Sequence, residues 1–566
     1  MNSSSRRTFL QRSGAVAAAL AAGPKMLAWT TEGSPQATTT AGKVGGFTEG
    51  GVHIFKSIRY GADTAKTRFQ PPQPAQKWSG VKDCTRFLTM APQLIPSRAA
   101  RNASPTGNLP TSASGVPGGP ADAGVQSEDC LRLNVFTPGL RDGKKRPVLC
   151  YFHGGAYNNG TVNNDLYDGR RLCHRGDVVV VTVNHRLNAF GYMYLGDLSP
   201  VYAKSGNAGQ LDLVLALQWI KDNIAEFGGD PSEVLIFGQS GGGAKCAALM
   251  ATPVAHGLFH RVLTMSGQQI KGASIEIASE RAHTVLEKLG AAGLNGKELE
   301  AKLNGASMEQ IQQASRAVSA DWLPVVDHVV LPRNPFDPDA PKLSASVPMM
   351  LGNVHDETMV SAPGGGEIRW ENAAAALDAA VHLYLGPVEA EEAVAEFRRI
   401  HPDYTPQQVC IAAATAFRAW PGQRIEAERR AADPESQPRT WVYQMNFTGA
   451  NGRAMHTIDI PFMFDNVAFA KGQIGSAPEQ LEAANGLAAI MSQMLITYGR
   501  TGNPNGDGPA GKPTQDGKLP YWPTYDLKSR ATMMWERTPR VENDPRRAER
   551  RFAERSRYHQ AGTPLP

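Results

Sequence analysis

The chain has 566 residues, of which 41% are apolar and 20% charged, and its formal net charge at pH 7 is +5. This composition is typical of an ordinary soluble globular protein, with room for one large domain or several small ones. The chain shows no basic stripe with interleaved aromatic residues, which argues against nucleic-acid binding. Its six scattered cysteines form no C-x-x-C pair, which argues against a disulfide scaffold and against a zinc site.

The N-terminus carries the pattern of an export signal. Residues 5–11 read S-R-R-T-F-L-Q, which resembles a twin-arginine signal, and a weakly apolar stretch follows at 14–23. That stretch is too short to span a bilayer. The pattern predicts a signal peptide at 1–29 of a bacterial protein that is exported to the periplasm or secreted. No stable membrane association is expected after cleavage. The alternative is a disordered basic N-terminus.

Two polar segments follow the signal. Residues 30–44 are rich in Thr, Ser and Gly and are expected to form a linker. Residues 96–124 are dense in Ala, Ser, Pro and Gly, cannot bury much apolar surface, and predict a long surface loop. Between these segments, residues 52–60 predict a strand pair. After the second segment, alternating apolar residues at 131–135 predict a half-buried strand.

Apolar runs of strand length then alternate with helical patterns. Residues 177–184 are nearly all β-branched, which is typical of a strand buried on both faces. Helical spacing at 212–227, and mostly helical patterns at 274–318 and 371–432, should cover the sheet. This alternation predicts an α/β protein with a doubly wound sheet. The other strands of that sheet are predicted at 147–152, 234–237, 261–266 and 346–351.

One turn stands out as a candidate for covalent chemistry. The strand at 234–237 enters the turn G-Q-S-G-G at 238–242, and a small-residue helical pattern follows. This is the G-x-S-x-G motif in its strand–turn–helix context, in which a strained turn exposes the serine hydroxyl at the N-terminus of a helix. Ser240 is therefore a candidate nucleophile. The alternative is a glycine-rich turn that happens to contain serine.

A serine nucleophile needs a base that takes its proton, an acid that orients the base, and N–H donors for the oxyanion. The H-G-G-A-Y run at 153–157 directly follows a strand and matches an oxyanion loop. His456 precedes an apolar segment and suits the chain order serine, acid, histidine. Asp356 and Glu357 both follow a strand, and spacing alone does not choose between these two acids.

Further motifs lie on both sides of the serine turn: S-E-D-C-L-R-L-N at 127–134, V-N-H-R-L-N-A-F-G at 183–191, G-N-A-G-Q-L-D at 206–212, F-G-G-D-P at 227–231, L-P-V-V-D at 323–327 and W-P-T-Y at 522–525. With these motifs the chain resembles the type-B carboxylesterases, which include cholinesterases and bacterial para-nitrobenzyl-type esterases. The resemblance covers roughly residues 44–537. It implies an α/β-hydrolase fold with a large, mostly parallel central sheet, covering helices and helical insertions. The corresponding domain is expected at 45–538, followed by a charged C-terminal tail at 539–566.

The resemblance also implies roles for single residues. Ser240 corresponds to the family's nucleophile, His456 to its general base and then acid, and Glu357 to its triad acid. The implied oxyanion hole consists of the backbone N–H groups of Gly155, Ala156 and Gly241. The resemblance further implies two structural ion pairs, Arg68 with Glu128 and Arg186 with Asp212.

The chain departs from the family pattern beside the serine. The family usually has glutamate before the nucleophile and alanine after it, where this chain has Gln239 and Gly241. Loss of the carboxylate predicts a lower affinity for cationic substrates, and no choline-binding tryptophan is evident at 96–126. One of the two cysteines that usually form the family's first disulfide is absent from its usual place. Because Cys84 lies upstream of that place, a bridge between Cys84 and Cys130 is a hypothesis.

These features predict a serine carboxylic-ester hydrolase that works through an acyl-enzyme and needs no metal or organic cofactor. Its expected substrates are small to medium, hydrophobic esters. Pocket candidates are Tyr157, Gln239, Trp322 and Phe417, although the three aromatic residues could equally be core residues. Alternatives are an amidase, a carbamate or natural-product-ester hydrolase with the same triad, and a non-catalytic binding protein on this fold. The sequence does not decide between a monomer and a dimer.

Overall fold

The computed structural model describes residues 34–94, 124–319, 321–508 and 510–563. The signal peptide predicted at 1–29 lies outside the described residues, as does nearly all of the loop predicted at 96–124. Within the described ranges, no helix combines the length and the apolar character that crossing a bilayer requires. Everything below concerns the compact unit that begins at Gln36.

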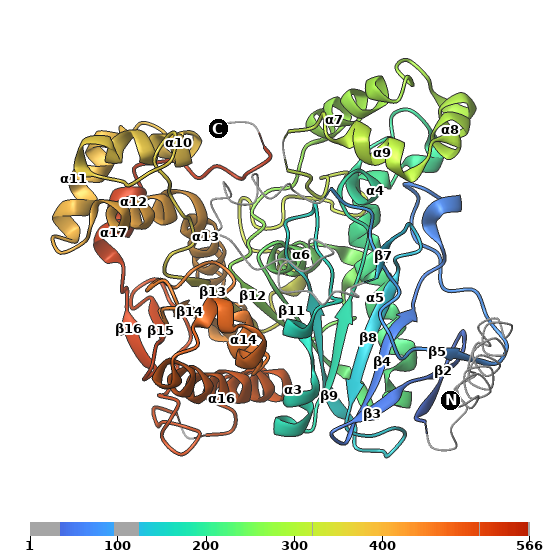
Figure 1. The fold of residues 1–566 in the computed structure, drawn as a ribbon, viewed down its shortest axis with the longest axis horizontal. Helices are drawn as coiled ribbons and strands as arrows, with labels where there is room; N and C mark the ends of the chain where they lie inside the picture. Colours follow the sequence, from blue (N-terminus) through green and yellow to red (C-terminus); the bar gives the residue numbers. More distant parts are fainter. Residues whose placement is uncertain (1–33, 95–123, 320, 509, 564–566) are drawn as a thin grey trace, which may run out of the picture. The chain divides into compact units, whose positions relative to one another are not determined.

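An eleven-stranded sheet runs through the described residues in the order β16-β15-β14-β13-β12-β11-β9-β10-β8-β4-β3 (Figure 1). The strands from β10 through β9 to β15 run parallel, whereas β3, β4 and β8 at one edge and β16 at the other are antiparallel to their neighbours. The strands are β3 (Phe47–Glu49), β4 (Val52–Arg59), β8 (Arg132–Thr137), β9 (Arg146–Phe152), β10 (Val179–Val183), β11 (Gly229–Gln239), β12 (Arg261–Met265), β13 (Met349–Val354), β14 (Thr440–Met445), β15 (Ala531–Trp535) and β16 (Arg540–Asn543). This topology confirms the predicted α/β-hydrolase fold.

The central strands are buried on both faces, as the sequence predicted. Alternate residues of β9 point to opposite faces. Val148 and Cys150 belong to a hydrophobic cluster with residues of α5 and α6, and Leu149 and Tyr151 to a second cluster with residues of α3 and α16. The helices of these two layers are α3 (Arg170–Gly176), α5 (Ala208–Asn223), α6 (Gly241–Met250) and α16 (Pro478–Thr501).

Two groups of helices are inserted after strands of the sheet. One group follows β12 and the other follows β13, and both lie beyond the same end of the sheet in Figure 1. Each group has a hydrophobic cluster of its own. These insertions confirm the helical patterns predicted at 274–318 and 371–432. Their helices are α7 (Ile275–Lys288), α8 (Gly296–Gly305), α9 (Met308–Ser315), α10 (Ala373–Leu385), α11 (Ala390–Ile400), α12 (Pro406–Ala414) and α13 (Trp420–Ala431).

Regular structure also lies within the ranges predicted as linker and tail. The strands β1 (Gln36–Thr39) and β2 (Gly42–Gly45) pair antiparallel. Residues 30–44 looked like a linker because the buried side chains of this strand pair are small or polar. At the other end, β16 joins the main sheet and α17 (Arg547–Ala553) follows it. The strand pair predicted at 52–60 is the single strand β4, whose antiparallel partner β3 precedes it.

Both ion pairs implied by the family resemblance are present. Arg68 and Glu128 approach to 2.6 Å, and Arg186 and Asp212 also approach to 2.6 Å, with all four side chains buried. Asp212 lies on α5 and also accepts a hydrogen bond of 2.9 Å from the backbone N–H of Arg186. This contact ties the helix to the loop after β10. A buried ion pair that is lost on one side leaves an uncompensated charge, so both pairs fix the scaffold.

The hypothesis of a disulfide between Cys84 and Cys130 is wrong for this structure. Both residues are free, buried cysteines in the same hydrophobic cluster, and so is Cys150. Burial raises the pKa of the Cys84 thiol to about 12, because the surroundings disfavour the charged thiolate. These cysteines therefore behave as small apolar core residues.

This arrangement predicts six free thiols per chain that react only after unfolding. With a thiol reagent at pH 7, the unreduced folded protein should show almost no reactivity, because burial keeps all six thiols protonated and shielded. The unreduced protein in guanidinium chloride should show six reactive thiols. A count of four after denaturation would reveal a disulfide and contradict the structure.

Candidate active site

The candidate nucleophile lies in the tight turn between β11 and α6. Ser240 has φ 56° and ψ −126°, a combination that residues with a side chain rarely adopt. Its backbone N–H donates a hydrogen bond of 2.7 Å to the carbonyl of Met265 at the end of β12. The strained turn is therefore fastened to the neighbouring strand. This geometry is that of a nucleophile elbow at the C-terminal end of the sheet.

Two glycines of the turn are required by close backbone contacts. A Cβ on Gly242 would overlap with the carbonyl oxygen of Phe152 at the end of β9. A Cβ on Gly241 would overlap with the backbone of Ala156. The sequence marked Gly241 as a departure from the family pattern, and the structure gives its physical reason. The loop after β9 lies so close to the elbow that the usual alanine does not fit.

The candidate base and acid form a close pair. Nδ1 of His456 lies 2.5 Å from Oε2 of Glu357, and both side chains are largely buried. The other carboxylate oxygen of Glu357 accepts a hydrogen bond of 2.9 Å from the N–H of Val354, the last residue of β13. The carboxylate thus holds the imidazole by one oxygen and is itself held by the other. This is the geometry in which an acid fixes the tautomer of a catalytic histidine.

The neighbouring acid has a different partner. Asp356 accepts hydrogen bonds of 2.8 Å from Nδ1 of His355 and 2.9 Å from the N–H of Ala454. The second bond ties the loop after β13 to the loop that carries His456. The tertiary structure therefore distinguishes the two acids, which their spacing in the sequence did not. Glu357 contacts the histidine, and Asp356 joins the two loops that present the pair.

Next to this pair lies a buried carboxyl group that no sequence motif indicated. Asp459 is completely buried and accepts a hydrogen bond of 2.9 Å from the hydroxyl of Tyr443. Burial, and then the negative charge of Glu357, raise the pKa of Asp459 to about 7. Its protonated form reduces repulsion between two buried carboxyl groups. No sequence signal other than its position three residues after His456 marked this residue.

The outer nitrogen of the imidazole faces the elbow. Nε2 of His456 lies 3.2 Å from the side-chain amide nitrogen of Gln239. With the Nδ1 proton directed at Glu357, Nε2 is the acceptor and the Gln239 amide is the donor. Gln239 was predicted as a pocket residue beside the nucleophile. Its amide here occupies the position from which a serine proton would be taken.

The loop after β9 is fixed by a buried lysine on α6. The ammonium group of Lys245 donates hydrogen bonds of 2.7 Å to the carbonyl of Ala156 and 3.2 Å to that of His153. Burial lowers the pKa of Lys245 to about 7. Ala156 has φ 50°, a left-handed conformation that favours glycine. Lys245 therefore helps to hold the loop in a strained shape. A lone lysine in an otherwise small and apolar helix was the sequence signal that could have revealed it.

The loop that carries the predicted oxyanion donors Gly155 and Ala156 lies against the elbow that carries the third, Gly241. A Cβ on Gly154 would lie 3.3 Å from Cβ of Ser240, so the loop passes directly beside the serine. Gly155 and Ala156 follow in this loop. Gly241 is the first residue of α6, where a backbone N–H has no acceptor within its own helix. The N–H groups of these residues can therefore serve a ligand at Ser240.

Ser240, Glu357 and His456 open onto one cavity of about 160 Å³. The three predicted aromatic pocket residues do not line it. Tyr157 and Trp322 lie in the cluster of the first insertion, and Phe417 lies in that of the second. Arg418, beside Phe417 in a π-helical turn at Thr415–Ala419, reaches the cavity instead. The remaining lining residues are Ser266, Gln268, Tyr384, Ala419, Tyr558, His559, Gln560 and Ala561.

Known proteins that resemble this chain fit the chemistry of such a site. The model of the carboxylesterase family matches residues 33–553. The para-nitrobenzyl esterase of Bacillus subtilis is 31% identical over 526 residues, which cover 90% of this chain and 96% of that protein. The cocaine esterase of Oryctolagus cuniculus is 30% identical, with 88% of this chain and 91% of that protein covered.

Solved structures give the same result. A carboxylesterase of Geobacillus stearothermophilus superposes with a TM-score of 0.72 at 29% identity, covering 91% of this chain and 99% of that one. An esterase from Clostridium hathewayi, described as able to hydrolyse aliphatic aromatic polyesters, superposes with a TM-score of 0.70 at 29% identity, covering 93% of this chain and 99% of that one. The similarity extends over nearly the full length of each of these structures.

The contact between Gly241 and Ala156 predicts an effect of restoring the usual alanine. Gly241→Ala should displace the loop after β9 and lower kcat for a p-nitrophenyl ester by about 10²-fold, the typical effect of losing one oxyanion donor. The double variant Gly241→Ala with Ala156→Gly should recover part of this loss, because glycine lets the loop backbone move away. If Gly241→Ala alone keeps wild-type kcat, the loop does not lie where the structure has it.

The buried Lys245 predicts a pH dependence of stability. Its pKa is about 7 in the folded protein and about 10.4 in an unfolded chain. Between these two pH values the unfolded chain binds a proton on Lys245 that the folded protein does not bind. The buried Lys245 therefore destabilises the folded protein less as the pH rises. The unfolding free energy of the wild type minus that of Lys245→Met should rise from about pH 7 to about pH 9. Urea titrations at each pH measure it, and a constant difference would contradict the assignment.

Proposed function

The chain belongs to the carboxylesterase family and hydrolyses carboxylic esters, and we propose that Ser240, His456 and Glu357 are its catalytic triad. The observation that carries this proposal is the 2.5 Å contact between His456 and Glu357. This pair opens onto the same cavity as Ser240. A serine nucleophile acting through an acyl-enzyme is also the mechanism typical of the family.

In the proposed first step, Oγ of Ser240 attacks the carbonyl carbon of the ester and gives its proton to Nε2 of His456. The imidazole must first exchange the Gln239 amide for the serine hydroxyl. Glu357 stabilises the resulting imidazolium. The N–H groups of Gly155, Ala156 and Gly241 receive the oxyanion, and each such donor is typically worth about 10²–10³-fold in rate.

In the second half of the reaction, the tetrahedral intermediate collapses and the carbon–oxygen bond of the alcohol breaks. His456 returns its proton to the departing alkoxide. A water molecule then loses a proton to the same histidine and attacks the acyl group on Ser240. Collapse of this second intermediate releases the carboxylic acid and restores the serine hydroxyl.

We infer that the substrates are small, neutral esters. Gln239 places a neutral amide beside His456 where the family usually has a carboxylate, so nothing at this position attracts a cation. Arg418 is a cation that lines the same cavity, and like charges repel. A cavity of about 160 Å³ also suits small ester groups.

We also infer that the protein acts outside the cytoplasm. This proposal rests on the S-R-R-T-F-L-Q run and the weakly apolar stretch that follows it. A bacterial host that exports the full-length protein, but retains a variant in which Lys replaces both Arg6 and Arg7, would support it.

Covalent labelling tests the assignment of the nucleophile. Diisopropyl fluorophosphate should add one diisopropylphosphoryl group per chain, on a peptide that contains Ser240, and should abolish hydrolysis of p-nitrophenyl acetate. Ser240→Ala should lose the label and reduce kcat by about 10⁴-fold or more. Ser266→Ala, a serine on the wall of the same cavity, is the matched control and should keep the label. Label on another serine, with Ser240 unmodified, would contradict the proposal.

A further inference from the structure

The C-terminal segment after α17 lies against the active-site cavity. Residues 558–561 line this cavity together with Ser240 and His456. The match to the carboxylesterase family ends at residue 553. The segment therefore lies beyond the residues that match the family model. The sequence pattern alone predicts only a charged tail at these residues.

The segment is anchored at residues 546–553, which include α17 and are firmly packed; we call these residues the root. Arg546 and Glu549 form an ion pair in which both side chains are about 95% buried. The ring of Phe552, at the end of α17, packs at 6.0 Å from that of Phe417 and 6.2 Å from that of Phe397. Phe417 belongs to the π-helical turn that brings Arg418 to the cavity. The root is thus joined to a wall of the site.

Beyond the root, the segment is tied to the second helical insertion. The hydroxyl of Ser556 donates a hydrogen bond of 2.7 Å to the carbonyl of Tyr384 in α10. The ring of His559 lies 5.4 Å from the ring of Tyr384. Both rings line the cavity, so this contact closes one side of it.

The far end is tied to the other side of the cavity. The side-chain oxygen of Gln560 accepts a hydrogen bond of 3.1 Å from the N–H of Ile270, which follows β12. It also accepts one of 3.2 Å from the hydroxyl of Tyr558. The guanidinium group of Arg281, in α7, donates to the carbonyl of Gly562. The segment therefore spans from the insertion after β13 to the insertion after β12.

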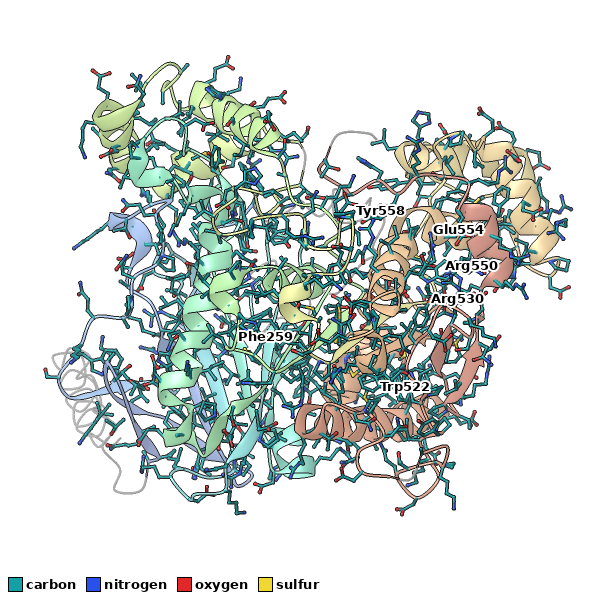
Figure 2. The ribbon with its side chains drawn as sticks, turned by 180° about the vertical axis from the view of Figure 1, so that it is seen from behind. Phe259, Trp522, Arg530, Arg550, Glu554 and Tyr558 are labelled. Atoms are coloured by element: carbon teal, nitrogen blue, oxygen red, sulfur yellow. The ribbon has the colours of Figure 1, made fainter. Side chains whose placement is uncertain are left out.

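The pictures agree with these contacts. In Figure 1 the red C-terminal segment leaves α17 beside α10 and runs toward α7. In Figure 2 the labelled Tyr558 lies between the two groups of inserted helices.

The cavity is also small. Ligand pockets usually measure roughly 300–1,000 Å³, and this one measures about 160 Å³.

We propose that residues 558–561, the cavity-lining part of the C-terminal strap (residues 556–562), are the specificity-determining wall of the active site and limit the size of the ester that it accepts. This proposal rests on the proposed function. Tyr558, Gln560 and Ala561 line the cavity onto which Ser240, Glu357 and His456 open. A bulky acyl or alcohol group therefore meets the strap before its carbonyl reaches Ser240.

Two substitutions in the full-length protein test the proposal in opposite directions. Tyr558→Ala should enlarge the cavity, and Ala561→Leu should reduce it. The matched control is Arg557→Ala, because Arg557 lies on the same segment and is exposed. For each variant, kcat/KM is measured for p-nitrophenyl acetate, butyrate and octanoate, and for 1-naphthyl and ethyl acetate. Together these substrates vary the acyl and the alcohol group separately.

The quantity to compare is kcat/KM for the bulky ester divided by kcat/KM for the small ester of the same series. Tyr558→Ala should raise this ratio about tenfold or more in one of the two series, which corresponds to relief of a steric contact. Ala561→Leu should lower it, and Arg557→Ala should leave it unchanged. A purely structural role would change all substrates alike, or change the urea midpoint without changing the ratio.

Organophosphate labelling of each variant separates the two proposals. Labelling of Ser240 in the wild type, with substrate ratios unchanged within about twofold in both Tyr558→Ala and Ala561→Leu, would overturn the strap proposal alone. Failure of Ser240 to label in the wild type would overturn the proposed function, and the strap proposal with it.

Discussion

The close approach of two backbone segments determines the geometry of this site. The nucleophile turn between β11 and α6 touches the loop after β9 so tightly that neither Gly241 nor Gly242 could carry a side chain. The serine and the oxyanion loop therefore have a fixed separation, which depends on packed backbone rather than on flexible side chains. Because interiors are close-packed, even one methyl group at this contact must displace the loop.

Gly241, which departs from the family pattern, acts together with Ala156 and Lys245 at this contact. Gly241 leaves room for the Ala156 peptide. Ala156 takes a left-handed conformation, and Lys245 binds its carbonyl from the buried side. A buried ammonium group is costly unless polar groups surround it, and the two loop carbonyls supply part of that need. The loop and the lysine therefore stabilise each other.

The site also shows how a sheet brings distant segments together. Each proposed catalytic group follows a different strand: the loop with the proposed oxyanion donors follows β9, Ser240 follows β11, Glu357 follows β13 and His456 follows β14. The ends of neighbouring parallel strands meet at one edge, so these loops converge without being near in sequence. Helical insertions after β12 and β13, with the C-terminal strap between them, enclose that edge.

The sequence by itself determined the central strands of the sheet, because near-continuous apolar runs such as β10 are typical of strands buried on both faces. The local motifs likewise determined Ser240 and the loop at 153–157, because an elbow and an oxyanion loop are short-range structures. Spacing left Asp356 and Glu357 open and the family resemblance implied Glu357, but only the tertiary structure shows that Glu357 contacts His456. Only the tertiary structure likewise showed the cysteines to be unpaired and placed Tyr157, Trp322 and Phe417 in hydrophobic clusters outside the cavity. It also showed that residues 558–561, within the predicted charged tail, line the active-site cavity. These outcomes depend on contacts between residues far apart in the chain, and no local pattern encodes such contacts.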